Sequence, residues 1–267
     1  IIFSSQASAD FLSESSDVHS PNDFGGIGLL QMPTARFSTD GQLSVGLSSA
    51  SPYNYLYFTL QLLPWLETTF RYAQVTNREF AIARSSGGNQ SLKDRGFDLK
   101  LRLLEESRYL PEVAVGLRDF LGTGLFAGEY IVATKNHEDF DFTLGLGWGR
   151  LGTQDHFGNP LGQISDRFNT RGDRSDEGGQ VEVRSWFRGS DVALFGGVQW
   201  QTPIEGLRLK IEYDGNDYQS EPLANNQDVD SPINVGLVYR ALNKLDVGLG
   251  YERGNTVTAN LTTYLNL

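Results

Sequence analysis

The sequence predicts an all-β protein, a transmembrane up-and-down antiparallel β-barrel of about twelve strands. Three observations lead to this prediction. Apolar and polar residues alternate along most of the chain after residue 40. The alternating runs are about ten residues long, which is the length that a tilted strand needs to cross a bilayer. The long connections all fall on one side of the barrel that these strands would form.

Residues 95–106, RGFDLKLRLLEE, show the alternation most clearly. The odd positions from 97 to 103 hold Phe or Leu, and the even positions between them hold Asp, Lys and Arg. Side chains on a strand point alternately to its two faces, so this strand has one apolar face and one charged face. Such a strand fits a soluble sheet with its charges in water, and it also fits a membrane barrel with its charges in the lumen.

The same pattern predicts every strand of the barrel in order. The predicted strands cover residues 42–50, 54–62, 65–76, 95–105, 111–119, 125–135, 140–148, 191–200, 206–214, 232–240, 244–252 and 255–265. No stretch of useful length repeats with the 3.6-residue period of a helix. Corners such as Leu63-Pro64 are short, whereas the third, seventh and ninth connections (77–94, 149–190 and 215–231) are long. With twelve strands, the short turns and both termini lie on the periplasmic side.

The charged face decides which way the strands point. It carries seven acidic and seven basic side chains: Glu67, Arg71, Asp98, Lys100, Arg102, Glu112, Arg118, Glu129, Arg208, Lys210, Glu212, Arg240, Asp246 and Glu252. Burying so many charges in a dry core is costly unless every one is paired. The apolar face alone is too thin to fill a soluble barrel of twelve strands. We therefore predict that these charged side chains line a polar lumen.

The apolar side chains of the opposite face are predicted to contact lipid. They include Leu43, Val45, Leu47, Leu66, Phe70, Tyr72, Phe97, Leu99, Leu101, Leu103, Phe142, Leu144, Leu146, Leu207, Leu209, Ile211, Val235, Leu237, Leu245, Val247 and Leu249. Aromatic residues near the strand ends are predicted to form interfacial girdles, with packing in a soluble core as the alternative. These aromatic residues are Trp65, Tyr130, Phe140, Trp148, Trp200, Tyr213, Tyr239 and Tyr251.

The first 40 residues lack the alternation, so we predict an N-terminal tail over 1–40 and the barrel over 41–267. Within the tail, DFGGIGLLQMPTARF (23–37) is a candidate plug, because it combines apolar residues with a Gly-Gly pair and a proline. Its apolar members are Ile27, Leu29, Leu30 and Met32. A periplasmic strap and an extra half-strand are the alternatives. The small residues at 7–9, Ala-Ser-Ala, are compatible with the end of a secretory cleavage site.

Composition and motifs exclude several classes of function. The chain has no cysteine, which excludes disulfides and thiolate metal sites. A formal net charge of −11 argues against nucleic acid as a partner. The sequence holds no Gly-x-Ser-x-Gly elbow and no His-Glu-x-x-His motif, and no pair of carboxylates stands out as a glycosidase dyad. We therefore predict a protein that is not an enzyme and has no catalytic residue, metal or cofactor.

Two of the long connections carry charged residues with alternative roles. The connection 215–231 and its edge hold five acidic residues and no Lys or Arg, which is typical of a solvated loop and also suits a hard cation. The connection 149–190 is rich in arginine. Arg150, Arg167, Arg171 and Arg174 are predicted either to contact phosphates of lipopolysaccharide and acidic sugars or to pair with acidic residues of the same connection.

Five segments of the chain carry a family resemblance. They are GLLQMPTARF, YFTLQLLPWLETTFRY, KDRGFDLKLRLLEESRYLPEVAVGLRDFLGTGLFAGEYIVATK, FTLGLGWGRLG and ALFGGVQWQTPIEGLRLKIEYD. These segments resemble the YjbH-like outer-membrane proteins that are linked to exopolysaccharide and group 4 capsule production. The resemblance implies an outer-membrane β-barrel that acts in polymer secretion, and it offers no catalytic residues. Members of that family are usually longer, which implies an N-terminal barrel portion or a short paralogue.

Together, the pattern and the resemblance predict an accessory component in the export or surface assembly of exopolysaccharide or capsule. The expected location is the outer membrane of a Gram-negative bacterium. The expected partners are outer-membrane lipid and lipopolysaccharide, the polysaccharide itself and other exopolysaccharide-secretion proteins, but not nucleic acid. The alternatives are a passive diffusion pore and a scaffold that does not transport but recruits a partner through its long loops or periplasmic tail.

Overall fold

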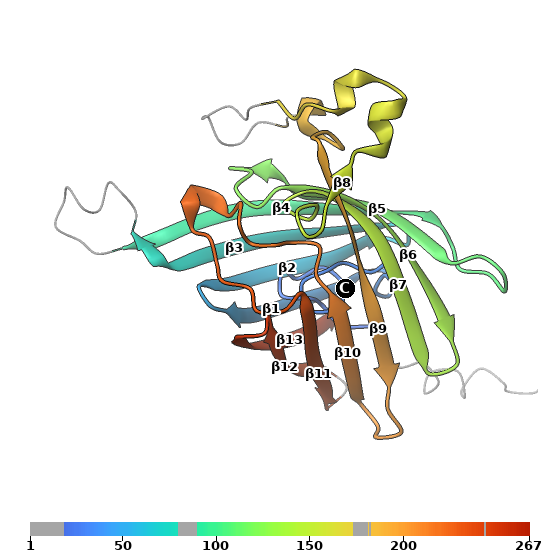
Figure 1. The fold of residues 1–267 in the computed structure, drawn as a ribbon. Coiled ribbons are helices and arrows are strands. Elements are labelled where there is room, and N and C mark those ends of the chain that lie inside the picture. The colour runs from blue at the N-terminus through green and yellow to red at the C-terminus, as the bar shows by residue number, and fades with distance from the viewer. Residues whose placement is uncertain (1–18, 80–89, 173–180, 182, 243) are drawn as a thin grey trace, which may run out of the picture.

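The computed structural model describes residues 19–79, 90–172, 181, 183–242 and 244–267. Within these residues, twelve antiparallel strands form a closed ring (Figure 1). The strands of the ring are β1 (Gln42–Ala50), β2 (Tyr53–Leu63), β3 (Leu66–Glu79), β4 (Ser91–Leu104), β5 (Glu112–Gly122), β6 (Gly128–His137), β7 (Phe140–Gly149), β9 (Asp191–Gln201), β10 (Leu207–Tyr213), β11 (Ile233–Ala241), β12 (Leu245–Glu252) and β13 (Thr256–Asn266). β1 pairs with both β2 and β13, and this pairing closes the ring.

The predicted fold class and all twelve predicted strands are confirmed. The largest difference is at β3 and β4, which form a longer hairpin than predicted because their polar ends continue to pair, for example Ala73 with Asp94. The remaining elements are short: β8 (Phe157–Gly158), η2 (Pro160–Gln163), η3 (Asp166–Phe168), η4 (Val183–Ser185) and η5 (Pro222–Ala224). None of the helices in the described ranges is both long and apolar enough to cross a membrane.

The two ends of the barrel differ in their connections. At one end, β1 begins, β13 ends, and only two residues each join β2 to β3 and β6 to β7; we name this the short-turn end. At the other end, long connections join β3 to β4, β7 to β9 and β10 to β11; we name this the long-loop end. The β7–β9 connection, drawn in yellow, rises above this end in Figure 1. The predicted asymmetry of the connections is therefore present.

The apolar face of the strands points outward. Large apolar side chains remain exposed in the middle of several strands, including Leu47, Leu144, Leu249 and Leu261. The inward face is crowded by aromatic side chains that lie over glycines on neighbouring strands. A Cβ atom added at Gly116 would lie 2.1 Å from the Tyr130 ring. The prediction of Tyr130 as a girdle residue is therefore wrong, because this ring points inward, where Gly116 leaves room for it.

Two further predictions fail under the β7–β9 connection. Glu129 and Trp148 face each other in the register of β6 and β7, beside the outward pair Ile131 and Leu146. Both therefore have the outward orientation, yet both are buried. The β7–β9 connection covers them, since Arg171 pairs with Glu129 and Phe187 packs edge-on against Trp148. Glu129 thus does not line the lumen, and Trp148 is not a girdle residue.

The predicted secretory cleavage site at residues 7–9 and Arg174 lie outside the described residues.

Candidate functional site

Residues 19–37, which we name the inserted segment, lie inside the barrel. Every residue from 20 to 37 except Gly26 is buried. At the short-turn end, the carbonyl of His19 accepts a hydrogen bond from Arg240 of β11 (3.0 Å). The other end of the segment leads into β1, which starts at the same end of the barrel. The inserted segment therefore enters and leaves the lumen through one mouth.

Local turn chemistry folds the inserted segment back on itself. Two isolated β-bridges pair Pro21 with Ile27 and Gly28 with Pro33. Between the first pair, Gly25 has φ of +100°, a conformation that favours glycine. A Cβ atom at this position would also lie 2.5 Å from the Tyr57 ring of β2. Gly25 is thus needed where the backbone turns against the barrel wall.

Glu212 of β10 binds the backbone of the inserted segment. Its carboxylate accepts hydrogen bonds from the N–H groups of Leu30 (2.9 Å), Gln31 (3.0 Å) and Met32 (2.8 Å). The Asn234 side chain of β11 donates a further bond (2.9 Å). A buried carboxylate needs such donors because it has lost its water. One wall residue therefore fixes three consecutive residues of the inserted segment.

Buried cations of β10 and β5 hold the carbonyl groups of the same segment. Lys210 Nζ donates to the carbonyls of Gly28 (2.7 Å) and Leu29 (2.9 Å). Arg118 of β5 donates to the carbonyl of Gln31 (3.0 Å). Neither cation forms an ion pair with a carboxylate in the described part of the chain. Backbone dipoles of the inserted segment thus take the place of anions.

Arg36 fastens the inserted segment at the short-turn end. Its guanidinium contacts three carboxylates from different elements: Glu106 (2.6 Å), Glu112 (3.0 Å) and Asp141 (2.8 Å). A planar guanidinium can bind several carboxylate oxygens at once in a fixed geometry. Lys100 adds to this end by donating to the Arg36 carbonyl (2.7 Å). The segment is therefore bound to β4, β5 and β7 where it leaves the lumen.

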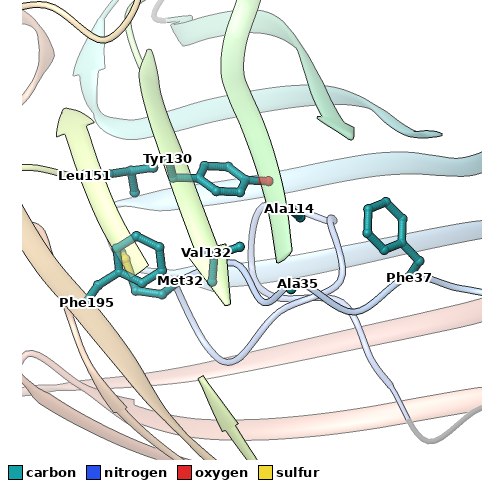
Figure 2. Close-up of a cluster of buried hydrophobic side chains, with 8 residues drawn as sticks. All are labelled: Met32, Ala35, Phe37, Ala114, Tyr130, Val132, Leu151 and Phe195. Carbon is teal, nitrogen blue, oxygen red and sulfur yellow. The ribbon is translucent and has the colours of Figure 1, made fainter. Parts of the chain in front are cut away.

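Apolar contacts fill the space that the polar contacts leave. Figure 2 shows Met32 and Ala35 of the inserted segment among inward side chains of the barrel, including Val132 and Phe195. On the side toward β3, β4 and β5, the remaining cavity has a volume of about 20 Å³. That volume holds about one water molecule. This cavity therefore has no room for a solute larger than water.

Phe24 forms the tip of the inserted segment toward the long-loop end. Three guanidinium groups lie over its ring, from Arg118 (3.9 Å), Arg71 (5.0 Å) and Arg150 (5.5 Å). The ring of Tyr55 lies 5.0 Å away. Cation–π contacts of this kind are strongest where water is excluded. The tip is thus enclosed by arginine and aromatic side chains.

The β10–β11 connection covers the tip. Arg150, just after β7, makes two hydrogen bonds to Glu221 (2.7 and 2.9 Å), which also accepts one from Tyr53. Burial alone would raise the pKa of Glu221, but the Arg150 guanidinium outweighs it and holds that pKa below the ordinary value of 4.5. Glu221 therefore stays charged at neutral pH, and Arg150 pairs with an acidic residue of the neighbouring connection.

The depressed pKa of Glu221 predicts acid-sensitive closure of the long-loop end. The ion pair stabilises the folded connection fully above the ordinary carboxyl pKa, and this contribution is lost as the pH falls through the lower pKa of the folded state. We expect the protection of the amides from 216 to 221 against hydrogen exchange, relative to the intrinsic rate at each pH, to stay high above roughly pH 5 and to fall below it. In Arg150→Met, this protection should be low at every pH; an unchanged pH profile in that variant would contradict the prediction.

The predicted lumen residues divide by their partners. Glu67, Lys100, Arg118, Lys210, Glu212, Arg240 and Glu252 bind the inserted segment by hydrogen bonds. Arg71 and Arg102 lie over its Phe24 and Phe37 rings, and Glu112 pairs with its Arg36. Asp98, Arg208 and Asp246 pair within the wall. The candidate plug residues Ile27, Leu29, Leu30 and Met32 are all buried among them.

Sequence reasoning missed two residues of the inserted segment, Arg36 and Phe24, that make several contacts with the wall. Arg36 and Phe24 stand at the edges of the apolar run, and no pattern distinguishes them from ordinary tail residues. Asp141 was not among the predicted lumen charges, although its position beside Phe140 and Phe142 follows the alternation. Among the described residues, no group of three or more acidic or histidine side chains is arranged to hold a metal ion.

A family model described as "Exopolysaccharide biosynthesis protein YbjH" (YjbH) matches residues 20–267. The chain is 49% identical over 247 residues to an uncharacterized lipoprotein YjbH of Escherichia coli K12. The matched region covers 92% of this chain and 35% of that protein. Among solved structures, the KdgM porin in complex with disordered oligogalacturonate is 10% identical (TM-score 0.43; 85% of this chain, 99% of that one). The NanC porin is 8% identical (TM-score 0.40; 85% and 99%).

Proposed function

The chain belongs to the YjbH family of exopolysaccharide biosynthesis proteins, and from this premise we propose that it is an accessory component in the export or surface assembly of exopolysaccharide. The proposal places the barrel in the outer membrane of a Gram-negative bacterium. The observation that carries it is the inserted segment, which occupies the lumen and is bound by wall residues on many strands. A barrel whose lumen is closed by a bound segment of its own chain suits a path for a polymer that opens only when that segment moves.

The outward face supports the membrane location. Exposed Leu47, Leu144 and Leu249 belong to an apolar surface that extends around the ring. A contiguous apolar surface of this extent needs lipid or a partner to cover it. The long connections gather at one end, as they do at the outer face of bacterial barrels.

The filled lumen argues against the passive diffusion pore. A passive pore keeps an aqueous channel, whereas buried side chains and the inserted segment fill this one. The scaffold alternative makes a different prediction, since it requires no movement of the inserted segment. A reversible cross-link between the segment and the wall separates export from scaffolding.

A cross-link through two introduced cysteines would be specific, because the chain contains no other cysteine. The Ala35 N–H lies 2.9 Å from Thr134 Oγ1 of β6, and both residues are fully buried. We expect Ala35→Cys combined with Thr134→Cys to form a disulfide in the oxidising periplasm. The gene with both substitutions should fail to restore surface polysaccharide in a strain that lacks it, whereas either single substitution should restore it.

The outcomes separate the candidate functions. Normal surface polysaccharide in the strain without the gene would refute the role in export or assembly. Full restoration by the cross-linked protein would instead favour the scaffold, because the segment then has no need to move. In planar bilayers, steady current through the native full chain would support the passive diffusion pore instead.

A further inference from the structure

The wall around Phe24 has the chemistry of a binding site. Tyr53 and Tyr55 of β2 and Phe126 of the β5–β6 connection pack together there, with ring centroids 5.4 to 6.2 Å apart. The guanidinium of Arg150 lies over the rings of Tyr53 (5.7 Å) and Phe126 (5.3 Å). Flat aromatic faces beside hydrogen-bonding groups bind ring-shaped ligands with one apolar face. Phe24 occupies the space that such a ring would fill.

Several donors at this wall have no partner. Arg71 Nε and Nη2 and Arg118 Nη1 are buried, and no hydrogen-bond acceptor in the described part of the chain satisfies them. Buried N–H groups of this kind are rare in native structures and call for an explanation. Arg71 has one ion pair, with Asp98 (2.6 Å), and Arg118 has none among the described carboxylates. The unsatisfied donors all belong to groups that prefer an anionic acceptor.

The inserted segment presents oxygen atoms to these cations as an anionic ligand would. The carbonyl of Gln31 accepts from Arg118, and the carbonyls of Gly28 and Leu29 accept from Lys210. A carbonyl dipole satisfies a buried cation less well than a carboxylate does. A ligand with a carboxylate would therefore compete for the same donors, since it supplies a full charge.

We propose that the wall around Phe24 binds an acidic sugar residue of the exported polymer, and that the inserted segment occupies this site in the closed barrel. The sugar ring replaces the Phe24 ring against Tyr53 and Tyr55, and its carboxylate pairs with Arg118. Polymer and inserted segment then exclude each other. This inference rests on the proposed function in polysaccharide export and adds the substrate class, a polysaccharide with acidic sugars.

Binding to the purified full chain in detergent tests the proposal. The probe is an alginate hexasaccharide, with a carboxylate on every sugar, and the matched neutral probe is maltohexaose. Titration calorimetry should detect the acidic probe, and the neutral probe should bind at least about tenfold more weakly, since a charge-assisted hydrogen bond is lost. Arg118→Gln should lose at least about tenfold in affinity, with Arg118→Lys in between.

Two controls make the result specific. Arg95 lies exposed on the outward face of β4, so Arg95→Gln should change the affinity less than about twofold. The cross-linked Ala35→Cys/Thr134→Cys chain should bind the acidic probe at least about tenfold more weakly and regain affinity on reduction. Lack of binding by the native chain, equal binding of both probes, or equal affinity of Arg118→Gln and native chain would each overturn the proposal. If surface polysaccharide still requires the gene, the proposed function survives that failure.

Discussion

Replacing Glu212 with alanine is expected to release the inserted segment from the barrel wall. The substitution removes the acceptor of three consecutive backbone N–H groups, those of Leu30, Gln31 and Met32. Lys210, on the same strand, loses one of the carboxylates that offset its buried charge. Breaking a buried charged contact of this kind costs about 3–5 kcal/mol. Hydrogen exchange of the three amides should quicken by roughly 100-fold or more, because 1.4 kcal/mol corresponds to a factor of ten.

Glu129→Ala is the matched control for this experiment. It also removes a buried carboxylate from a strand, but its partner is Arg171 of the β7–β9 connection. This variant should loosen that connection and leave exchange at residues 30–32 unchanged. In planar bilayers, Glu212→Ala should show current and Glu129→Ala should not. Slow exchange at residues 30–32 in Glu212→Ala would mean that the segment is held by its other contacts.

Leu261→Arg is expected to destabilise the barrel by about 2–4 kcal/mol, the cost of a cation at the lipid-facing midplane. Leu261 lies at the middle of β13, between Leu47 and Val247 in the register, and its side chain is exposed on the outward face. A guanidinium at this depth has to leave water for hydrocarbon. The free energy of unfolding, measured by denaturant titration in lipid vesicles, reports the loss.

The same strand supplies a control for depth. Leu265 is an exposed leucine on the same face of β13, close to the short-turn end. Leu265→Arg should cost only about 0–1 kcal/mol, because the cation lies near the membrane interface there. Equal losses in the two variants would show that the outward face is not in contact with a bilayer core, and the membrane location would be wrong.

The fold could be predicted from the sequence because strand alternation is a local property. Within each strand of the ring, apolar and polar residues alternate, and an odd or even position in the strand assigns each side chain to one face of the sheet. Thirteen of the fourteen predicted charges point inward for this reason. Glu129 shares the outward parity of Ile131, so the alternation itself contradicts its assignment to the lumen, and its burial is due to the β7–β9 connection that covers it. Coverage by a distant connection is not a local property.

The contacts of the inserted segment could not be predicted for a related reason. Leu30 and Glu212 are 182 residues apart, and their hydrogen bond is a consequence of closing the ring. Equal numbers of acidic and basic lumen residues are expected either in networks that rigidify the wall or in contacts that hold a plug. In the structure, many of them bind backbone groups of the inserted segment, which have no signature in a sequence. Apolar composition identified the segment as a candidate, and only the closed barrel identifies its partners.

The shared mouth of the inserted segment has a consequence for how the barrel opens. Because His19 and Arg36 both reach Asp141 at the short-turn end, residues 19–36 form a loop whose two ends lie at the same mouth of the lumen. A loop can be drawn back through its own entrance without threading, and its hydrogen bonds break a few at a time rather than all together. Tension applied at His19 from the short-turn end would act first on the contacts at that end and last on Phe24, so the barrel would open from the short-turn end toward the long-loop end.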